Sequence, residues 1–325
     1  MKPKLIIRML ALLIFIGTVF FITGCSSEQY LVLDPKGPIG ESQKDLIIIS
    51  TLLCAVIIVP VLIMTAIIVW RYRDHKGSKA AYKPEWEHNT KLEITWWSIP
   101  IVIILILAVI TARYTYALEP SKPIVSEEKA ITIQVTSMDW KWMFNYPEQG
   151  IATVNYIQIP KGVPVRFELT SDTAMNSFWV PQLGGQIYTM SGMAMTLYLQ
   201  ADEVGKYFGS GANFNGRDFA QMTFEVNATT TDDFNTWVNQ VKKDYPPLTT
   251  EGFEKLREPG PSDHKFYSSF PEGLFDKIMR QYSVDGQSHH GHGAPDAKKS
   301  ESNESKKSTA TPAPKKSDTQ SHTGH

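Results

Sequence analysis

Residues 205–222 read Gly-Lys-Tyr-Phe-Gly-Ser-Gly-Ala-Asn-Phe-Asn-Gly-Arg-Asp-Phe-Ala-Gln-Met, a glycine-rich segment among short runs of alternating apolar and polar residues. Such runs begin near 130, 155, 163 and 222, and turn residues separate them. A region of about 100 residues with this pattern suits a β-sandwich. The sequence therefore predicts a sandwich over 124–228, which is long enough to bury its own core.

Two long apolar runs precede the predicted sandwich, at 45–70 and 94–118. As a helix, each run is long enough to cross a hydrocarbon layer about 30 Å thick. Pro60 and Pro100 are compatible with this reading, because neighbouring helices in a membrane satisfy the carbonyls that proline leaves free. We predict a membrane α + β protein with a transmembrane helix hairpin over 45–118.

The segment that joins the two apolar runs is basic. Loops rich in lysine and arginine remain in the cytoplasm. The N-terminus and the sandwich are therefore predicted to face outward, in a two-pass protein of the cell membrane. The basic residues are Arg71, Arg73, Lys76, Lys79, Lys83 and Lys91.

The first 24 residues have the pattern of a lipoprotein signal peptide. A basic start precedes an apolar run at 9–22, and small residues stand directly before Cys25. We predict lipidation of Cys25 by diacylglyceryl and palmitate, with 25–44 as an extracytoplasmic segment. The alternative is an uncleaved membrane helix. Cys54, the other cysteine, lies inside an apolar run, which excludes a disulfide framework.

The chain beyond the sandwich divides into a helical extension over 229–284 and a tail over 285–325. A helical pattern at 233–243 places Phe234, Trp237, Val238 and Val241 on one stripe. The tail is poor in apolar residues and is predicted to be disordered. Its histidines could bind a transition metal loosely, and a plain solvated tail is the alternative. They are His289, His290, His292, His322 and His325.

Several functional classes are excluded by composition. The net charge of −1 gives no electrostatic case for nucleic-acid binding. No cysteine or histidine occurs from 124 to 253, so the sandwich lacks the thiolate and imidazole ligands that suit copper.

Three sequence runs resemble the second subunit of haem-copper oxidases, in the quinol oxidase branch of Gram-positive bacteria. The resemblance covers about 25–282 and implies a cupredoxin-like Greek-key sandwich. It also implies a proton-translocating complex that oxidises quinol, here menaquinol, and reduces oxygen to water. Haems and copper would reside in subunit I, with subunits III and IV as further partners. The runs are Val-Leu-Asp-Pro-Lys-Gly-Pro (32–38), Asp-Trp-Lys-Trp-Met-Phe-Asn-Tyr-Pro-Glu-Gln (139–149) and Phe-Trp-Val-Pro-Gln-Leu-Gly-Gly-Gln (178–186).

Copper-bearing members of that family carry His-Ser-Phe/Trp-x-Val-Pro followed by Cys-x3-Cys-x3-His-x2-Met. On this frame the chain keeps the scaffold residues and loses the two cysteines and two histidines. The resemblance therefore implies a degenerate, non-binding site and no cofactor on this chain, and it puts an interface magnesium in doubt, because Asn213 replaces a glutamate. The ligand positions are occupied by Asn176, Gly211, Asn215, Phe219 and Met222.

Three further residues are candidates for a role in the complex. Glu93 stands just before the second span and resembles the family's glutamate at the cytoplasmic mouth of a proton path. The alternative for Glu93 is an exposed acid favoured by the helix dipole. Trp140 and Trp142 flank Lys141, so in a strand they would share one face. We expect both to pack against subunit I or the lipid interface.

Two other functions fit parts of the sequence. One is subunit II of a cytochrome c oxidase, which would need a copper relay. The other is a non-redox lipoprotein that aids oxidase assembly or handles copper. Metal analysis distinguishes the first function from a quinol oxidase subunit. Copurification distinguishes the second, because an assembly factor should be substoichiometric in the active enzyme.

Overall fold

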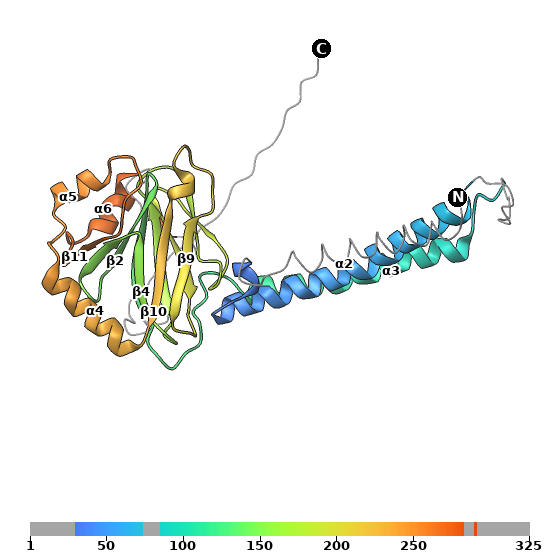
Figure 1. Ribbon diagram of the computed structural model, residues 1–325, viewed down its shortest axis with the longest axis horizontal. Coiled ribbons are helices and arrows are strands. Elements are labelled where there is room, and N and C mark those ends of the chain that lie inside the picture. Colours follow the sequence, from blue (N-terminus) through green and yellow to red (C-terminus); the bar gives the residue numbers. More distant parts are fainter. Residues whose placement is uncertain (1–29, 74–84, 283–288, 291–325) are drawn as a thin grey trace, which may run out of the picture. The chain divides into compact units, whose positions relative to one another are not determined.

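The computed structural model describes residues 30–73, 85–282 and 289–290 (Figure 1). The predicted signal peptide, Cys25, three lysines of the basic loop and nearly all of the predicted tail lie outside the described residues. Of the tail, His289–His290 form the two-residue strand β12, whose backbone pairs with Met193 and Ala194 of β8.

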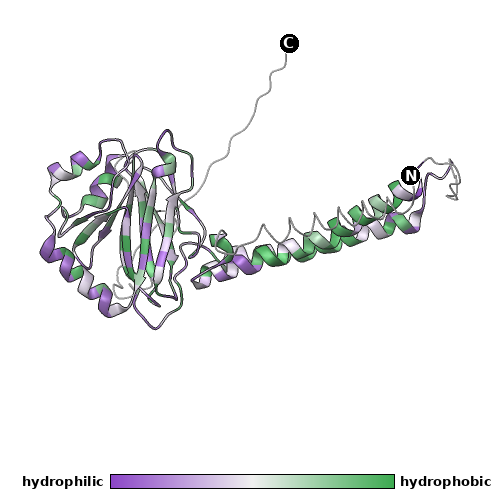
Figure 2. Cartoon of the chain, viewed as in Figure 1, coloured by the Kyte–Doolittle hydropathy of each residue, from purple (hydrophilic) through white to green (hydrophobic). Residues whose placement is uncertain are grey.

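Two long helices, α2 (Pro38–Arg71) and α3 (Thr90–Ala117), contain the predicted membrane spans. Each is long and apolar enough to cross a membrane. Figure 2 shows hydrophobic residues along both. The helices contact each other, and both continue through their prolines, Pro60 and Pro100. The predicted hairpin is confirmed.

The sandwich consists of two sheets, with strand orders β11-β3-β2-β1-β5-β8-β12 and β4-β10-β9-β6-β7. Parallel pairs, β1 with β5 and β10 with β4, interrupt the antiparallel ladders. The predicted two-sheet sandwich is confirmed. Its strands are β1 (Ile131–Met138), β2 (Lys141–Tyr146), β3 (Ile151–Val154), β4 (Tyr156–Pro160), β5 (Val165–Ser171), β6 (Asn176–Trp179), β7 (Ile187–Thr189), β8 (Met193–Leu199), β9 (Gly205–Gly211) and β10 (Thr223–Thr229).

Aromatic side chains fill the space between the sheets. The rings of Phe178 and Phe224 stack with centroids 5.0 Å apart, and Trp142 meets them edge-on at 5.5 and 5.7 Å. A Cβ on Gly209 would lie 2.1 Å from the Phe224 ring. Gly209 is therefore required because the stacked rings occupy the volume of its side chain.

The C-terminal extension packs on the sandwich through α4 (Thr231–Asp244), α5 (Thr250–Leu256) and α6 (Leu274–Gln281). The predicted helix at 233–243 is confirmed, and Phe234, Val238 and Val241 join the sandwich core. The extension is not only helical, because its strand β11 (Lys265–Tyr267) pairs with β3 at the edge of the larger sheet.

The start of α2 and the segment before it are bound to the sandwich by backbone hydrogen bonds. Lys36 N donates to Gln182 O (2.8 Å), Asp202 N donates to Lys36 O (2.8 Å), and Gly40 N donates to Leu183 O (3.1 Å). A short 3-10 turn, η2 (Leu31–Leu33), precedes this segment. The run at 32–38 thus fixes the start of the first membrane helix on the sandwich.

Candidate functional site

Four of the five residues that the sequence resemblance aligns with copper ligands meet at one end of the sandwich. Asn176 begins β6, Gly211 ends β9, and Met222 directly precedes β10. Asn215, from the loop between them, donates from Nδ2 to Asn176 Oδ1 and lies 3.2 Å from Met222 Sδ. We call Asn176, Gly211, Asn215 and Met222 the amide cluster.

Neutral hydrogen bonds hold the amide cluster in place. The Asn176 side chain is 1% exposed, and its Nδ2 donates to Ser137 Oγ (3.3 Å) and to the carbonyl of Ala174 (3.1 Å). The hydroxyls of Ser137 and Thr189 share a further hydrogen bond of 2.9 Å. Because each of these groups is uncharged and most are paired, the cluster forms without a strong local field.

Phe219, the fifth of these residues, lies outside the amide cluster, and its side chain has no polar atom to join the hydrogen bonds. It lies in a 3-10 turn, η3 (Phe219–Gln221), where its ring packs against Phe214 with centroids 5.4 Å apart. Phe214 is 76% exposed. The neighbouring Asn213 donates to the carbonyl of Met175 (3.2 Å), which joins this loop to the one before β6.

The residues of the amide cluster do not fit a dinuclear copper centre. Such a centre needs soft thiolates and imidazoles, whereas this end offers two amides and one thioether. The position of Gly211 also has little spare room, since a Cβ there would lie 3.3 Å from Met222 Sδ. Across the described ranges, no three His, Cys, Asp or Glu side chains gather closely enough to hold a metal ion.

The two tryptophans lie in different environments, which corrects the prediction that they share one interface face. Trp142 is 0% exposed and belongs to the aromatic core, so it has no surface for a partner or lipid. Trp140 is in the turn before β2 with a φ of 59°. Side chains two positions apart share a face only in an extended strand, and the left-handed backbone of Trp140 interrupts the extended conformation. Only Trp140, half-buried beneath the guanidinium of Arg217 at 5.9 Å, stays near the surface.

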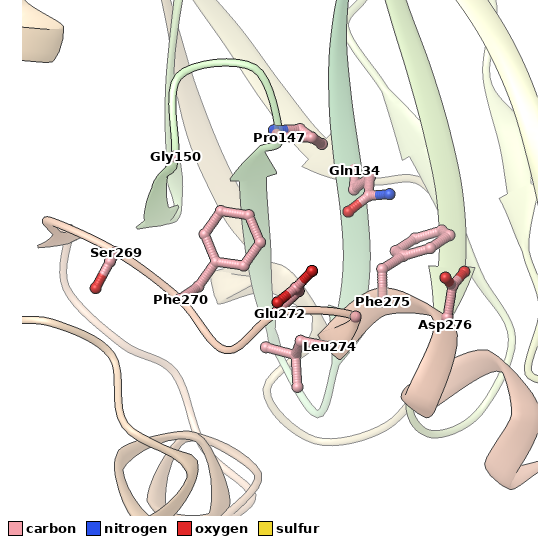
Figure 3. Close-up of a pocket in the computed structure, with 10 residues that line it drawn as sticks. Gln134, Pro147, Gly150, Ser269, Phe270, Glu272, Leu274, Phe275 and Asp276 are labelled. Carbon is pink, nitrogen blue, oxygen red and sulfur yellow. The ribbon is translucent and has the colours of Figure 1, made fainter.

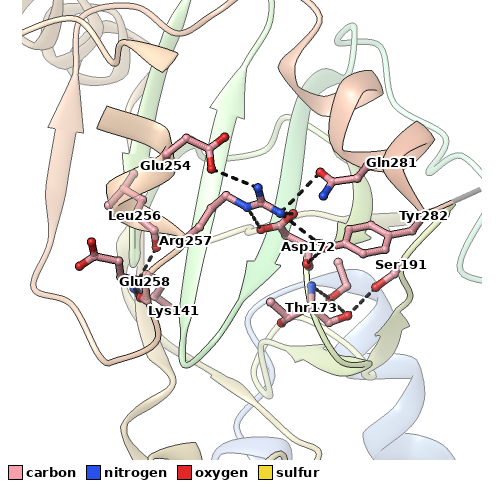
Figure 4. A network of polar contacts seen from close by, with 11 residues as sticks. Lys141, Asp172, Thr173, Ser191, Glu254, Leu256, Arg257, Glu258, Gln281 and Tyr282 are labelled. Atoms are coloured by element: carbon pink, nitrogen blue, oxygen red, sulfur yellow. Dashed lines mark hydrogen bonds and ion pairs between the residues drawn. The ribbon is translucent and has the colours of Figure 1, made fainter. Parts of the chain in front are cut away.

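A second set of polar residues joins the C-terminal extension to the same end of the sandwich (Figure 4). Arg257 donates from Nε and Nη2 to the two carboxylate oxygens of Asp172, at 2.8 and 3.1 Å. Tyr282 donates to the carbonyl of Asp172 (2.7 Å). Lys141 donates from Nζ to the carbonyls of Leu256 (3.0 Å) and Glu258 (2.6 Å). We call Lys141, Asp172, Arg257 and Tyr282 the C-terminal clamp.

Burial shapes the ionisation of the C-terminal clamp. Asp172 is 1% exposed, and burial raises the pKa of its carboxyl, while Arg257 opposes the rise. The hydrogen bond to Asp172 in turn raises the pKa of the Arg257 guanidinium, which keeps its charge. Burial lowers the pKa of Lys141. These residues were missed in the sequence, although a lysine between two tryptophans is an available signal for a buried cation.

Glu93 lies in the first turn of α3, as predicted from the sequence. Its Oε1 accepts from the backbone N of Asn89 (3.2 Å) and lies 3.5 Å from His88 Nδ1. The Asn89 side chain accepts from Leu92 N (3.1 Å). Asn89 and Glu93 therefore cap the helix reciprocally, a local role that is compatible with proton exchange.

A shallow pocket of about 450 Å³ lies between the larger sheet and α6 (Figure 3). The ring of Phe270 lies near the carboxylate of Glu272, and Gln134 lines the opposite side. Glu272 and Asp276 are exposed and flank the start of α6, where acidic residues complement the helix dipole. Helix stabilisation accounts for these carboxylates.

The sequence is similar to several oxidase subunits. It is 41% identical over 285 residues to ubiquinol oxidase subunit 2 of Acetobacter aceti, covering 87% of this chain and 91% of that protein. It is 42% identical to cytochrome bo(3) ubiquinol oxidase subunit 2 of Pseudomonas putida (87% and 88%) and 44% identical to quinol oxidase subunit 2 of Bacillus subtilis (83% and 82%). No protein-family model matches the sequence.

The chain is also similar to solved structures, among them the periplasmic domain of subunit II of cytochrome oxidase of Bradyrhizobium japonicum. That domain is 23% identical, with a TM-score of 0.34, covering 35% of this chain and 96% of that one. A chain of a heme-copper terminal oxidase dimer is 14% identical, with a TM-score of 0.34, covering 42% and 99%.

Proposed function

This chain belongs to the quinol oxidase subunit 2 family, and we propose that it serves its complex as a copper-free second subunit. The complex is a terminal quinol oxidase, in which quinol is oxidised and oxygen is reduced to water. The membrane helices α2 and α3 anchor the chain, and the sandwich forms its extracytoplasmic part. Subunit I is its principal partner, and subunits III and IV complete the assembly.

The observation that carries this proposal is the chemistry of the amide cluster. Amide and thioether groups stand where a copper relay needs thiolates and imidazoles. Electrons therefore have no metal station in this sandwich. Quinol dissolves in the membrane and can deliver its electrons there, so that the haem and copper groups of subunit I receive them without a relay on the outer surface.

Metal content and electron donor test this proposal together. The purified complex should oxidise quinol and not reduced cytochrome c, and this chain, separated from subunit I, should hold no copper. Near-infrared absorption from a mixed-valence copper pair in this chain would contradict the proposal. Turnover with cytochrome c alone would point to a cytochrome c oxidase, and substoichiometric recovery with the active enzyme to an assembly lipoprotein.

We further propose menaquinol as the physiological donor, as the resemblance to the Gram-positive branch implies. Relatives named ubiquinol oxidase are 41–42% identical to this chain, and the Bacillus relatives are 43–44% identical. Sequence identity alone therefore does not indicate which quinol the complex oxidises. Turnover of the purified complex with menaquinol and ubiquinol analogues of equal chain length tests this choice. A preference for ubiquinol would contradict it.

Glu93 is proposed as the proton-collecting carboxylate of this subunit. It lies at the start of α3, where a carboxylate can exchange protons with water on one side and a buried path on the other. Glu93→Gln keeps a capping oxygen but removes the titratable group, so it should slow oxygen consumption and leave haem spectra unchanged. Glu87→Gln, at an exposed position near the same helix start, is the matched control. Equal turnover of the two variants would remove Glu93 from the proton path.

The remaining proposals concern the lipid anchor and the orientation of the chain in the membrane. We propose that Cys25 carries a diacylglyceryl group and an N-linked palmitate, and that the basic loop between α2 and α3 is cytoplasmic. The intact mass of the mature chain tests lipidation directly. Protease accessibility of the sandwich in inverted and right-side-out vesicles tests the orientation.

A further inference from the structure

A second pocket, of about 530 Å³, lies where the first membrane helix meets the sandwich. Leu46 and Ile47 of α2 form one wall, Trp179 and Pro181 form another, and Val32 and Ala212 contribute at the sides. The volume lies within the range of small-molecule and cofactor sites, about 300–1,000 Å³. The pocket is therefore large enough for part of an organic ligand.

The walls of this pocket are packed closely around two glycines. A Cβ on Gly40 would lie 2.9 Å from the carbonyl oxygen of Gln182, and one on Gly185 would lie 2.8 Å from Gln43 Nε2. The ion pair of Lys36 with Glu203 (3.0 Å) also joins the segment before α2 to the sandwich. The pocket is thus a built feature of the junction between α2 and the sandwich.

The lining chemistry selects an uncharged, mainly apolar ligand. Among the described residues, none that lines the pocket is ionisable, and the amides of Gln43 and Gln186 are the most polar groups there. A phosphate group would require a lysine, an arginine or a helix N-terminus to balance its charge. Acyl chains need only apolar walls, and the two amides can donate to their ester carbonyls.

The pocket also lies at the membrane boundary. Leu46 and Ile47 are the first residues of the apolar run of α2, directly after Lys44 and Asp45. Trp179, half-buried beside them, is of the residue type that favours this level of the bilayer. A ligand in the pocket would therefore be in reach of the outer leaflet.

The length of the N-terminal segment connects this pocket to a lipid of the chain itself. Cys25 precedes Val32, a lining residue, by seven positions. At about 3.3–3.6 Å per residue, that segment spans at most about 25 Å. A lipid on Cys25 is thus tethered close to an uncharged apolar pocket at the outer surface of the membrane.

We propose that the pocket between α2 and the 179–186 loop binds an acyl chain of the diacylglyceryl group carried by Cys25. This inference rests on the lipidation proposed above. An acyl chain seated there covers Leu46 and Ile47 and ties the outer end of α2 to the sandwich. The lipid then orients the extracytoplasmic domain in addition to anchoring it.

Photo-cross-linking of the whole complex tests the proposal. Cells are fed a fatty acid that carries a diazirine, the purified complex is irradiated, and its peptides are analysed by mass spectrometry. We expect a cross-linked product that joins the Cys25 peptide to peptides containing Leu46–Ile47 or 179–186. Ala212→Trp fills the pocket and should abolish this product, whereas Ala220→Trp, in the exposed η3 turn, should leave it unchanged.

Each other outcome overturns the inference in a recognisable way. If the intact mass shows no lipid on Cys25, the lipidation proposal fails and this inference falls with it. If Cys25 is lipidated but its cross-links reach only the partner subunit, the acyl chain lies elsewhere. If the pocket peptides carry phospholipid adducts without the Cys25 peptide, the occupant is a free membrane lipid.

Discussion

The amide cluster and the C-terminal clamp close the same end of the sandwich by opposite means. Both contact the loop at 172–175, since Asn176 donates to Ala174 O while Arg257 binds Asp172. The amide cluster uses neutral hydrogen bonds between side chains. The clamp uses a buried carboxylate with a bidentate arginine. We therefore expect the clamp, rather than the amide cluster, to contribute most of the stability of this end.

Arg257→Ala should have the largest effect, because it leaves the carboxylate of Asp172 buried without its partner. Removal of one member of a buried ion pair costs about 3–5 kcal/mol, and the lower value is expected here because Arg257 is partly exposed. The free energy of unfolding is measured by urea titration of the detergent-solubilised chain, followed by tryptophan fluorescence.

Glu254→Ala is the matched control for that variant. Glu254 also binds Arg257, at 3.1 Å, but its side chain is half exposed. Exposed pairs contribute about 0–1 kcal/mol. Equal losses for the two variants would show that burial of Asp172 is not what makes the clamp stabilising.

The loss caused by Arg257→Ala should shrink as the pH falls. Burial raises the pKa of Asp172 above its unfolded value of 3.8, and Arg257 opposes that rise. Without Arg257 the pKa rises further. A carboxyl with a raised folded-state pKa favours folding below its unfolded pKa, and this contribution is lost as pH rises through the folded pKa. The difference between variant and wild type should therefore be greatest near pH 7 and decline toward pH 4. A difference that is constant over this range would contradict the assignment to Asp172.

Asn176→Ala should have a smaller effect than Arg257→Ala. The substitution leaves Ser137 and Asn215 without a shared neutral partner, and a lost buried hydrogen bond of this kind costs about 1–3 kcal/mol. Asn213→Ala, which removes a single exposed hydrogen bond to Met175, is the control. A cost for Asn176→Ala that exceeds the cost for Arg257→Ala would reverse the comparison.

The two regions also differ in how far the sequence predicts them. The residues of the amide cluster could be named in advance, because they occupy fixed spacings within a family frame. Of the strands that carry them, only the one after Met222 was predicted, and β6 and β9 were not. The C-terminal clamp could not be predicted, since Asp172 and Arg257 lie 85 positions apart. Helix and strand periodicities relate only residues that are close in the sequence, so they do not predict this contact. Trp142 was misplaced for a related reason: alternation assumes an extended backbone, and the positive φ of Trp140 breaks it.

Substitution of Phe214 should cause the smallest change in stability. It also tests whether the loop beside the amide cluster contacts a partner. This residue is 76% exposed and contacts Phe219, so Phe214→Ser should change the free energy of unfolding by only about 0.5 kcal/mol. An exposed aromatic residue beside the amide cluster is nevertheless suited to a protein interface, where aromatic anchors contribute most of the binding energy. We therefore expect Phe214→Ser to lower the yield of subunit I that copurifies with this chain. Phe208→Ser, at an exposed ring on β9, is the control. If both variants copurify with subunit I as the wild type does, Phe214 makes no contact with the partner and the interface assignment is wrong.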